Sequence, residues 1–246
     1  MRRFFLEQKE IKGSKSYISG TDARHIKTVL RLKPGDRIGL FDGAGNEYSA
    51  GITGFSHDRV EVSILDSFPS VAEPSVQIIV SQALLKDRKM DILVRQLTEL
   101  GISGLIPFVA ERSVSRPDAK RLIMRRERWN KISKEALKQC KRGRIMKIGE
   151  PVFFEDALKI GKDADLKVIF WEKESKSVDF AISHFGSKFE KIFLMLGPEG
   201  GFTVNEIEKA ASYEFVSASL GPRVLRAETA TIAASVMIQY IFGDLR

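Results

Sequence analysis

The sequence has 246 residues, of which 43% are hydrophobic and 29% are charged, and its formal net charge is +8 at pH 7. This length fits one large domain or two unequal domains. No segment approaches the ~18 uninterrupted apolar residues of a membrane span, and the N-terminus lacks the apolar core of a signal peptide. The single Cys140 excludes an internal disulfide framework and a cysteine-based zinc site, and the three histidines are widely spaced. We therefore expect a cytoplasmic protein without a metal site.

The first 70 residues predict a small β-rich domain, residues 1–70. Thr21 and Asp22 are expected to cap a helix that runs to Arg31. Turn signals at 33–36 and 42–45 bracket a strand over 37–41, and further strands are expected over 47–52 and 59–65. Short strands joined by tight turns indicate a small barrel. Its basic residues are compatible with nucleic-acid backbone contacts and equally with an ordinary surface; they are Arg2, Arg3, Arg24, Lys27, Arg31 and Lys33.

A proline-containing linker over 67–75 leads into a second domain, residues 71–246, in which strands alternate with helices. Strands are expected over 76–80, 105–109, 166–171, 192–196 and 215–220. Helices are expected over 87–100, from Thr203 onward and over 228–242. Gly101 is a plausible C-cap for the first of these helices. This alternation predicts a largely parallel sheet.

The positive charge of the chain is concentrated in one block of the second domain. Between Arg116 and Lys147 lie thirteen Lys or Arg residues and three acidic residues, a local charge of +10, so the rest of the chain carries −2. A phosphate-binding face requires such a block, although a solvated basic helix would have the same composition. Helical spacing places Trp129, Ile132, Ala136 and Cys140 on one face. Cys140 is therefore interpreted as a packed thiol.

Two of the predicted strands end in a Gly-Pro pair, at Gly197-Pro198 and Gly221-Pro222. Open α/β sheets bind ligands where a buried strand ends and a helix begins. Since the two exits are close in the chain, both loops are expected to enclose one pocket. Thr203 and Glu206 form a predicted capping box for the helix after the first loop.

The segment GPEGGF, residues 197–202, has three interpretations. A phosphate cradle lacks the expected glycine motifs, and Glu199 would repel a phosphate. The glycines could instead serve only the turn between strand and helix. The third interpretation is a neutral or cationic ligand with hydroxyls in a glycine-walled slot, which suits S-adenosylmethionine. The pattern alone does not separate this ligand from other nucleosides.

The segments LMLGPEGGFTVNEIE (194–208) and LGPRVLRAETA (220–230) resemble the signature of the RsmE-type family, the 16S rRNA (uracil-N3)-methyltransferases of the SPOUT class. HIKTVLRLKPGD and FDGAGNEY, from His25 and Phe41, are similar to the PUA-like RNA-binding domain of that family. QLTELGI (96–102) and the ERS triplet at Glu111 fit its second domain. The resemblance covers the whole chain. It implies an α/β fold with a C-terminal trefoil knot, a homodimer, and S-adenosylmethionine as the cofactor.

The resemblance also implies the site residues. Arg226 would stabilise the negative charge on the uracil oxygens, assisted by Arg112 or Arg223; the alternative for Arg226 is a structural ion pair with Glu199 or Glu228. The cofactor-binding residues would be Phe170, Glu172, Leu196, Gly197, Pro198, Glu199, Gly200, Gly201, Leu220, Gly221, Leu225, Arg226, Glu228 and Thr229. The RNA contacts would be Arg2, Arg3, Arg24, Lys27, Arg31, Gln139, Arg142 and Arg144.

The chain departs from the family pattern at Ala227 and Ala230, where threonine is usual. Around Cys140 the usual Glu, Gly and Pro are also replaced, while Gln139 and Arg142 are kept. The resemblance implies N3 methylation of a specific uridine in the 16S rRNA of the small ribosomal subunit. The alternative is a non-catalytic rRNA-binding or ribosome assembly factor that keeps the fold.

Overall fold

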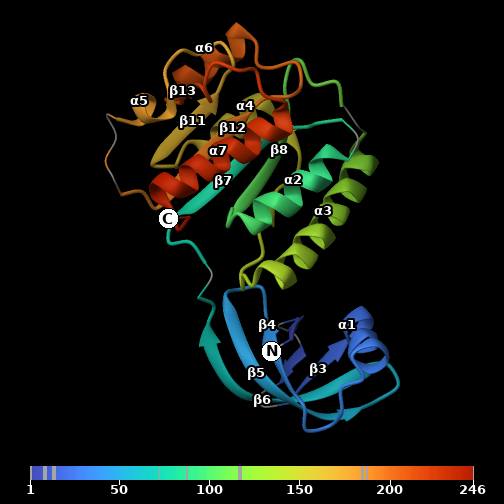
Figure 1. Cartoon of the computed structure of the whole chain (residues 1–246). Helices are drawn as coiled ribbons and strands as arrows, with labels where there is room; N and C mark the ends of the chain where they lie inside the picture. The colour runs from blue at the N-terminus through green and yellow to red at the C-terminus, as the bar shows by residue number, and fades with distance from the viewer. Residues whose placement is uncertain are drawn as a thin grey trace. The chain divides into compact units, whose positions relative to one another are not determined.

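The computed structural model of the chain describes residues 2–7, 10–12, 15–71, 73–86, 88–115, 118–183, 186 and 188–245. The chain divides into two compact units, each with its own sheet (Figure 1). The first unit contains Met1–Glu73 and Leu137–Ile145, and the second contains Pro74–Ala136 and Met146–Arg246. The sequence assigned 137–145 to the second domain, whereas the structure groups this segment with the first unit.

The first unit is built on a six-stranded sheet with the order β1-β4-β5-β6-β3-β2. β1 pairs with β4 in parallel, and the other pairings are antiparallel. The predicted β-rich module is therefore confirmed, although β1, β2 and β3 were not expected. β6 continues into the predicted linker because its last residues pair with the start of β5. The strands are β1 Arg3–Phe5, β2 Ile11–Lys12, β3 Lys15–Ser19, β4 Arg37–Phe41, β5 Asn46–Phe55 and β6 Arg59–Pro69.

One helical segment packs on this sheet. It consists of α1 (Gly20–Arg24) and a π-helical continuation, η2 (His25–Val29). Its N-cap is Ser19, which makes no side-chain capping bond. The predicted cap at Thr21 and Asp22 is wrong, because both residues lie inside the helix. Ala23 and Ile26 are buried in the core of this unit.

The second unit contains a seven-stranded sheet with the order β10-β8-β7-β12-β11-β13, and β9 pairs with β8. Its pairings are parallel, as the alternation of strands and helices predicted. β12 lies between β7 and β11 and is an almost continuous apolar run, as expected for a strand that is covered on both faces. The strands are β7 Gln77–Ala83, β8 Gly104–Val109, β9 Lys147–Ile148, β10 Val152–Phe153, β11 Leu166–Phe170, β12 Lys191–Leu196 and β13 Val216–Ala218.

Helices cover both faces of this sheet (Figure 1). The core on one face takes side chains from α2 (Lys89–Glu99), α3 (Ala119–Cys140), α5 (Val178–Ile182) and α7 (Ala227–Phe242). The core on the other face takes side chains from α4 (Phe154–Gly161) and α6 (Val204–Ser212). Among the residues that the structure describes, no helix is long and apolar enough to cross a membrane. The trefoil knot stays a prediction.

The carboxyl ends of three neighbouring strands lie together. Phe170 at the end of β11 pairs in register with Leu196 at the end of β12 and with Ala218 at the end of β13. Because these strands are parallel, the segments that leave them emerge at the same edge of the sheet. The segment after β11 and both Gly-Pro loops therefore meet there.

Candidate active site

A cavity of about 490 Å³ opens at this edge of the sheet, and the two Gly-Pro loops enclose it as the sequence predicted. α2 contributes Lys89, and α7 contributes Ala227 and Ala230. The first loop, 197–201, is called the GPEGG loop below, and 220–226 is called the LGPRVLR loop. The lining residues are Lys89, Phe170, Trp171, Glu172, Leu196, Gly197, Pro198, Glu199, Gly200, Gly201, Phe202, Ser219, Leu220, Gly221, Arg223, Val224, Leu225, Arg226, Ala227 and Ala230.

Two residues of the predicted cofactor set do not line the cavity, namely Glu228 and Thr229. Glu228 is bound to Lys89, and Thr229 is exposed in the first turn of α7. Ala227 and Ala230, the two positions where the chain departs from the family, are part of the cavity wall. The missing threonines therefore remove hydroxyl groups from this wall.

A buried glutamine anchors the GPEGG loop. Gln82 at the end of β7 is fully buried, and its Nε2 donates to the carbonyl oxygens of Gly197 at 3.1 Å and Ala83 at 3.0 Å. Its Oε1 accepts a hydrogen bond from the hydroxyl of Thr231 in α7. Because a buried amide must find hydrogen-bond partners, Gln82 fixes the GPEGG loop to β7 and to α7. Gln82 was not among the predicted site residues, although a polar residue within an apolar strand is a signal of such an anchor.

The glycines of the GPEGG loop are required by packing within the protein. A Cβ on Gly197 would lie 3.3 Å from the Phe202 ring, and one on Gly200 would lie 3.1 Å from Cβ of Arg112. Gly201 has a φ of +66°, and a Cβ there would lie 2.5 Å from Oε1 of Glu172. These glycines therefore have a packing role, which is compatible with a ligand in the slot.

Lys89 joins three elements around the cavity. Its Nζ lies 3.2 Å from Oε1 of Glu199 in the GPEGG loop and 3.2 Å from Oε2 of Glu228 in α7. Oε1 of Glu199 also accepts from the backbone N–H of Lys86 at 3.1 Å. The sequence pattern gave no sign of this cluster, because its members are distant in the chain.

Burial disfavours the charged form of Glu199, but hydrogen bonds from its own N–H, the Lys86 N–H and Lys89 lower the pKa of this carboxyl below its ordinary value. Burial likewise opposes the charge of Lys89, but its hydrogen bonds to Glu199 and Glu228 raise the pKa of the ammonium. Both groups are thus charged at neutral pH. Glu199 and Glu228 share the one positive charge of Lys89, so this cluster has a net charge of −1 and still disfavours a phosphate. The same pairing means that Lys89 is not a free phosphate ligand.

The segment that follows β8 is hydrogen-bonded to the GPEGG loop and to the start of α6. The predicted capping box of α6 is present: the Thr203 hydroxyl accepts from the Glu206 N–H at 3.2 Å, and Glu206 Oε2 accepts from the Thr203 N–H at 2.9 Å. Glu111 extends the box, because its N–H donates to Glu206 Oε1 at 2.9 Å and its carboxylate accepts from Thr203. Next to it, Arg112 Nη1 donates to the Gly200 carbonyl at 3.1 Å.

The structure places the three predicted catalytic arginines differently. Arg223 and Arg226 line the cavity and are exposed, whereas Arg112 is not among the lining residues. The structural alternative for Arg226 was an ion pair with Glu199 or Glu228, and both carboxylates are paired with Lys89 instead. Within the described part of the chain, the Arg226 side chain has no ion-pair partner. Its guanidinium is therefore available to a ligand.

The predicted RNA-binding residues lie in the first unit and fall into two groups. Arg2, Arg24, Arg31, Gln139 and Arg144 are exposed. Lys27 is half-buried, and its Nζ bonds the carbonyl oxygens of Ser56 and His57. Arg3 lies 4.9 Å from the Phe41 ring centre and 2.9 Å from the Glu47 carboxylate.

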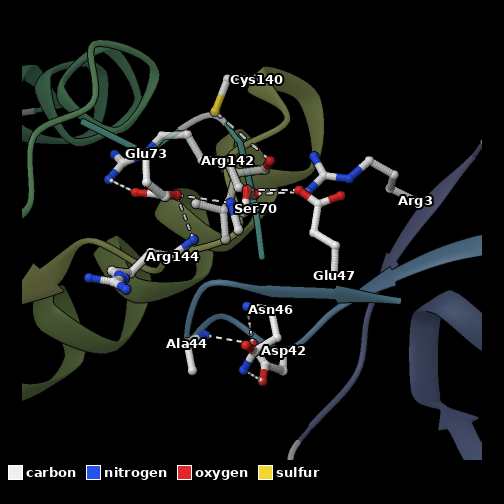
Figure 2. A network of polar contacts seen from close by, with 12 residues as sticks. Arg3, Asp42, Ala44, Asn46, Glu47, Ser70, Glu73, Cys140, Arg142 and Arg144 are labelled. Atoms are coloured by element: carbon white, nitrogen blue, oxygen red, sulfur yellow. Dashed lines mark hydrogen bonds and ion pairs between the residues drawn. The ribbon is translucent and has the colours of Figure 1, made fainter. Parts of the chain in front are cut away.

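Figure 2 shows the polar network that surrounds Arg142. The Arg142 side chain is only 4% exposed and forms an ion pair with Glu73 at 3.1 Å. The other oxygen of Glu73 accepts from the N–H groups of Gly143 and Arg144 at 2.9 and 2.7 Å. The predicted RNA contact of Arg142 is therefore corrected: this buried guanidinium holds the segment after α3 within the first unit.

Much of the basic block is already paired. Arg128 binds Asp91 at 2.6 Å, Arg126 binds Glu150 at 2.9 Å, and Lys138 binds Asp22 at 2.9 Å. The block therefore offers fewer free cations than its composition indicates.

Cys140 is a half-buried free thiol, in line with the packed role predicted for it. In the described ranges, no group of three or more metal-ligating side chains is placed to hold a metal ion.

Comparison with known families identifies both parts of the chain. The profile of the RNA methyltransferase domain matches residues 72–239, and that of the RNA methyltransferase PUA domain matches residues 18–65. A Bacillus subtilis protein named ribosomal RNA small subunit methyltransferase E is 32% identical, with 98% of this chain and 96% of the relative covered. The chain belongs to this methyltransferase E family. A Rickettsia conorii member is 31% identical over 97% of this chain and 95% of its own length.

Solved structures of the methyltransferase E family have the same fold as this chain. A Neisseria gonorrhoeae member bound to S-adenosyl methionine has a TM-score of 0.85 and 27% identity, with full coverage of both chains. A Legionella pneumophila protein described as a methyltransferase in complex with the cofactor SAM has a TM-score of 0.87 and 29% identity, covering 99% of this chain and 98% of its own. The PUA-like domain and the α/β methyltransferase fold expected from the sequence are thus confirmed.

Proposed function

We propose that this protein methylates N3 of a specific uridine in 16S rRNA and takes the methyl group from S-adenosylmethionine. The observation that supports this proposal most directly is the cavity between the GPEGG and LGPRVLR loops. It lies at the carboxyl ends of β11, β12 and β13, in a chain of the methyltransferase E family. Relatives with the same fold are described with this cofactor bound.

The residues of the cavity fit S-adenosylmethionine. A volume of about 490 Å³ lies within the ~300–1,000 Å³ of typical small-molecule sites. Phe170, Leu196, Leu220 and Leu225 supply apolar walls for a flat base, and the glycines allow the backbone to approach it. The buried Nε1 of Trp171 has no partner within the described part of the chain and is a donor for a ligand. The one lining lysine is neutralised, which suits a nucleoside without phosphate.

The proposed roles of the arginines follow from the chemistry of uracil. N3 carries a proton, and its removal spreads negative charge over the two carbonyl oxygens. Arg226, assisted by Arg223, would stabilise that charge electrostatically. Arg112, which donates to the Gly200 carbonyl, would assist this charge stabilisation. When bound, S-adenosylmethionine supplies an electrophilic methyl group.

We further propose that residues 1–70, together with the segment 137–145, form the RNA-binding domain and that the rest of 71–246 forms the catalytic domain. Exposed Arg2, Arg24, Arg31, Gln139 and Arg144 would contact rRNA phosphates. The partner would be the small ribosomal subunit in the cytoplasm, and the active form would be a homodimer. Sedimentation of the purified protein tests the last point: a monomer at micromolar concentration would contradict it.

One assay tests the proposed activity. The purified protein is incubated with radiolabelled S-adenosylmethionine and small ribosomal subunits, free 16S rRNA or tRNA, and the product nucleosides are identified. We expect 3-methyluridine in the small-subunit RNA and none in tRNA. Incorporation into no RNA, together with binding of the small subunit, would support the alternative of a non-catalytic rRNA-binding factor.

A further inference from the structure

We infer that Glu172 is the general base that accepts the N3 proton of the target uracil. This inference rests on the proposed function and extends it, because the arginines of the site cannot take a proton at neutral pH. A carboxylate in the cavity can accept this proton, provided that it is not already paired with a cation.

Glu172 lies in the turn that follows β11, which the Glu174 N–H closes on the Trp171 carbonyl at 3.2 Å. Its carboxylate packs against Gly201: the two oxygens lie 2.5 and 2.9 Å from the position of a Cβ on that residue. Any side chain at 201 would displace the carboxylate. The GPEGG loop thus leaves a space for this group in the wall of the cavity.

The other titratable groups of the cavity are unsuitable as bases. Lys89 and Glu199 are bound to each other, and the pKa of Glu199 is lowered, although burial opposes this, by its hydrogen bonds. The lining residues include no histidine and no cysteine. Among the described residues, Glu172 makes no hydrogen bond or ion pair. It is therefore the carboxylate in this wall that is free to accept a proton.

The charged groups that share the cavity with Glu172 support this role. Arg223 and Arg226 line the cavity from the LGPRVLR loop, the Lys89–Glu199 pair lines it from α2 and the GPEGG loop, and Arg112 is held at the neighbouring Gly200. Arginines near the uracil oxygens make the N3 proton more acidic, so a carboxylate is a sufficient acceptor.

In the proposed step, the N3–H bond breaks and its proton passes to a Glu172 oxygen. The nitrogen electron pair forms the N3–CH₃ bond, and the pair of the sulfur–methyl bond stays on sulfur. The products are 3-methyluridine, S-adenosylhomocysteine and protonated Glu172, which returns its proton to water. No oxidant or additional reactant is needed.

The first test compares wild type with Glu172→Gln and Glu172→Asp. General bases contribute about 10²- to 10⁴-fold, so kcat of Glu172→Gln on small subunits should fall by at least about 100-fold. Glu172→Asp should recover part of the rate. Glu172 also lines the cofactor cavity, so the cofactor Kd from calorimetry can weaken in both variants, but by a much smaller factor than kcat falls in Glu172→Gln, because the proposed role concerns the RNA base. An equal loss of affinity and turnover in Glu172→Gln would overturn the inference.

The second test makes the N3 proton easier to remove. Between about pH 7 and about pH 9, the residual rate of Glu172→Gln should rise up to tenfold per pH unit, because only the uracil anion then reacts. Subunits reconstituted with 5-fluorouridine rRNA should rescue this variant far more than wild type, since fluorine acidifies N3. A parallel response of both proteins would overturn the inference. Absence of methyl transfer by wild type itself would instead refute the proposed function.

Discussion

The two loops of the cavity share a Gly-Pro pair but lie in very different environments. The GPEGG loop is bonded by Gln82, Lys89 and Arg112, which come from three separate elements. The LGPRVLR loop is exposed from Gly221 to Val224, and Val224 is 81% exposed. The described hydrogen bonds at its start are local ones, between the Ser219 hydroxyl and the backbone of Gly221.

This difference indicates that the two loops have different roles. A loop that is bonded to three elements keeps its shape without a ligand, which is the condition for a preorganised binding wall. An exposed loop whose two arginines have no ion-pair partner among the described residues can adapt to an RNA base and offers charge to it. We therefore expect substitutions in the GPEGG loop to act on cofactor affinity, and substitutions of the two arginines in the LGPRVLR loop to act on turnover.

The largest effect on affinity is expected from Gly197→Val. Its Cβ would lie 3.3 Å from the Phe202 ring, which is buried and stacked on Phe108 with centroids 6.3 Å apart, so the ring or the loop must shift to make room. Calorimetry should show a Kd for S-adenosylmethionine weakened by at least about 100-fold, or ~2.7 kcal/mol. Circular dichroism should show a folded protein. Affinity equal to wild type would contradict the rigid wall.

Arg226→Ala tests the other half of the comparison. Loss of one charge-stabilising donor typically lowers kcat by about 10²- to 10³-fold, and we expect this range for methyl transfer to small subunits. The cofactor Kd should change by less than about threefold. Arg223→Ala is the matched variant from the same loop and should lose less activity. A proportional loss of affinity and turnover in Arg226→Ala would make this residue part of the cofactor site.

Lys89→Met should have an intermediate effect, about a tenfold loss of cofactor affinity, because Glu199 and Glu228 lose their shared cation. Lys89→Arg keeps the charge and should retain most of the affinity.

The folded-state pKa of Glu199 is lowered from 4.5. The contribution of Glu199 to the free energy of unfolding is therefore present above that pH and is lost as the pH falls through the lowered value.

Thermal unfolding of Lys89→Met tests the pairing of Lys89 with Glu199 without an activity measurement. Wild type should have the higher Tm at neutral pH, and the two proteins should converge as the pH falls through the lowered pKa of Glu199. A Tm difference that does not depend on pH would show that Lys89 acts through packing instead of charge.

The smallest effect is expected from Gly221→Ala. Gly221 has a φ of +103°, and no atom lies within 4 Å of its Cβ position. The substitution should cost about 1–3 kcal/mol of stability through backbone strain alone. The cofactor Kd should weaken by only about three- to fivefold, well below the loss for Gly197→Val. A loss equal to that of Gly197→Val would remove the distinction between the two loops.

The elements that the sequence predicted well are those with a local signal. The predicted strand over 37–41 is β4, and the capping box at Thr203 is present, because turn residues and caps act over three or four positions. The short strands β9 and β10 and the short helix α5 were missed, since two to five residues leave no periodicity. The wrong cap at Thr21 shows that a favourable residue type does not fix a helix start.

The sequence by itself determined the parallel sheet and the meeting of the two Gly-Pro loops, since apolar runs and strand exits depend on neighbouring residues. Only the tertiary structure decided which charges are free. Lys89 binds Glu199 and Glu228, and Glu73 buries Arg142, although these partners are 69 or more positions apart. Charge pairing depends on distance in space, which composition does not contain. Among the described residues, Glu172, Arg223 and Arg226 are therefore left as the unpaired charges of the cavity.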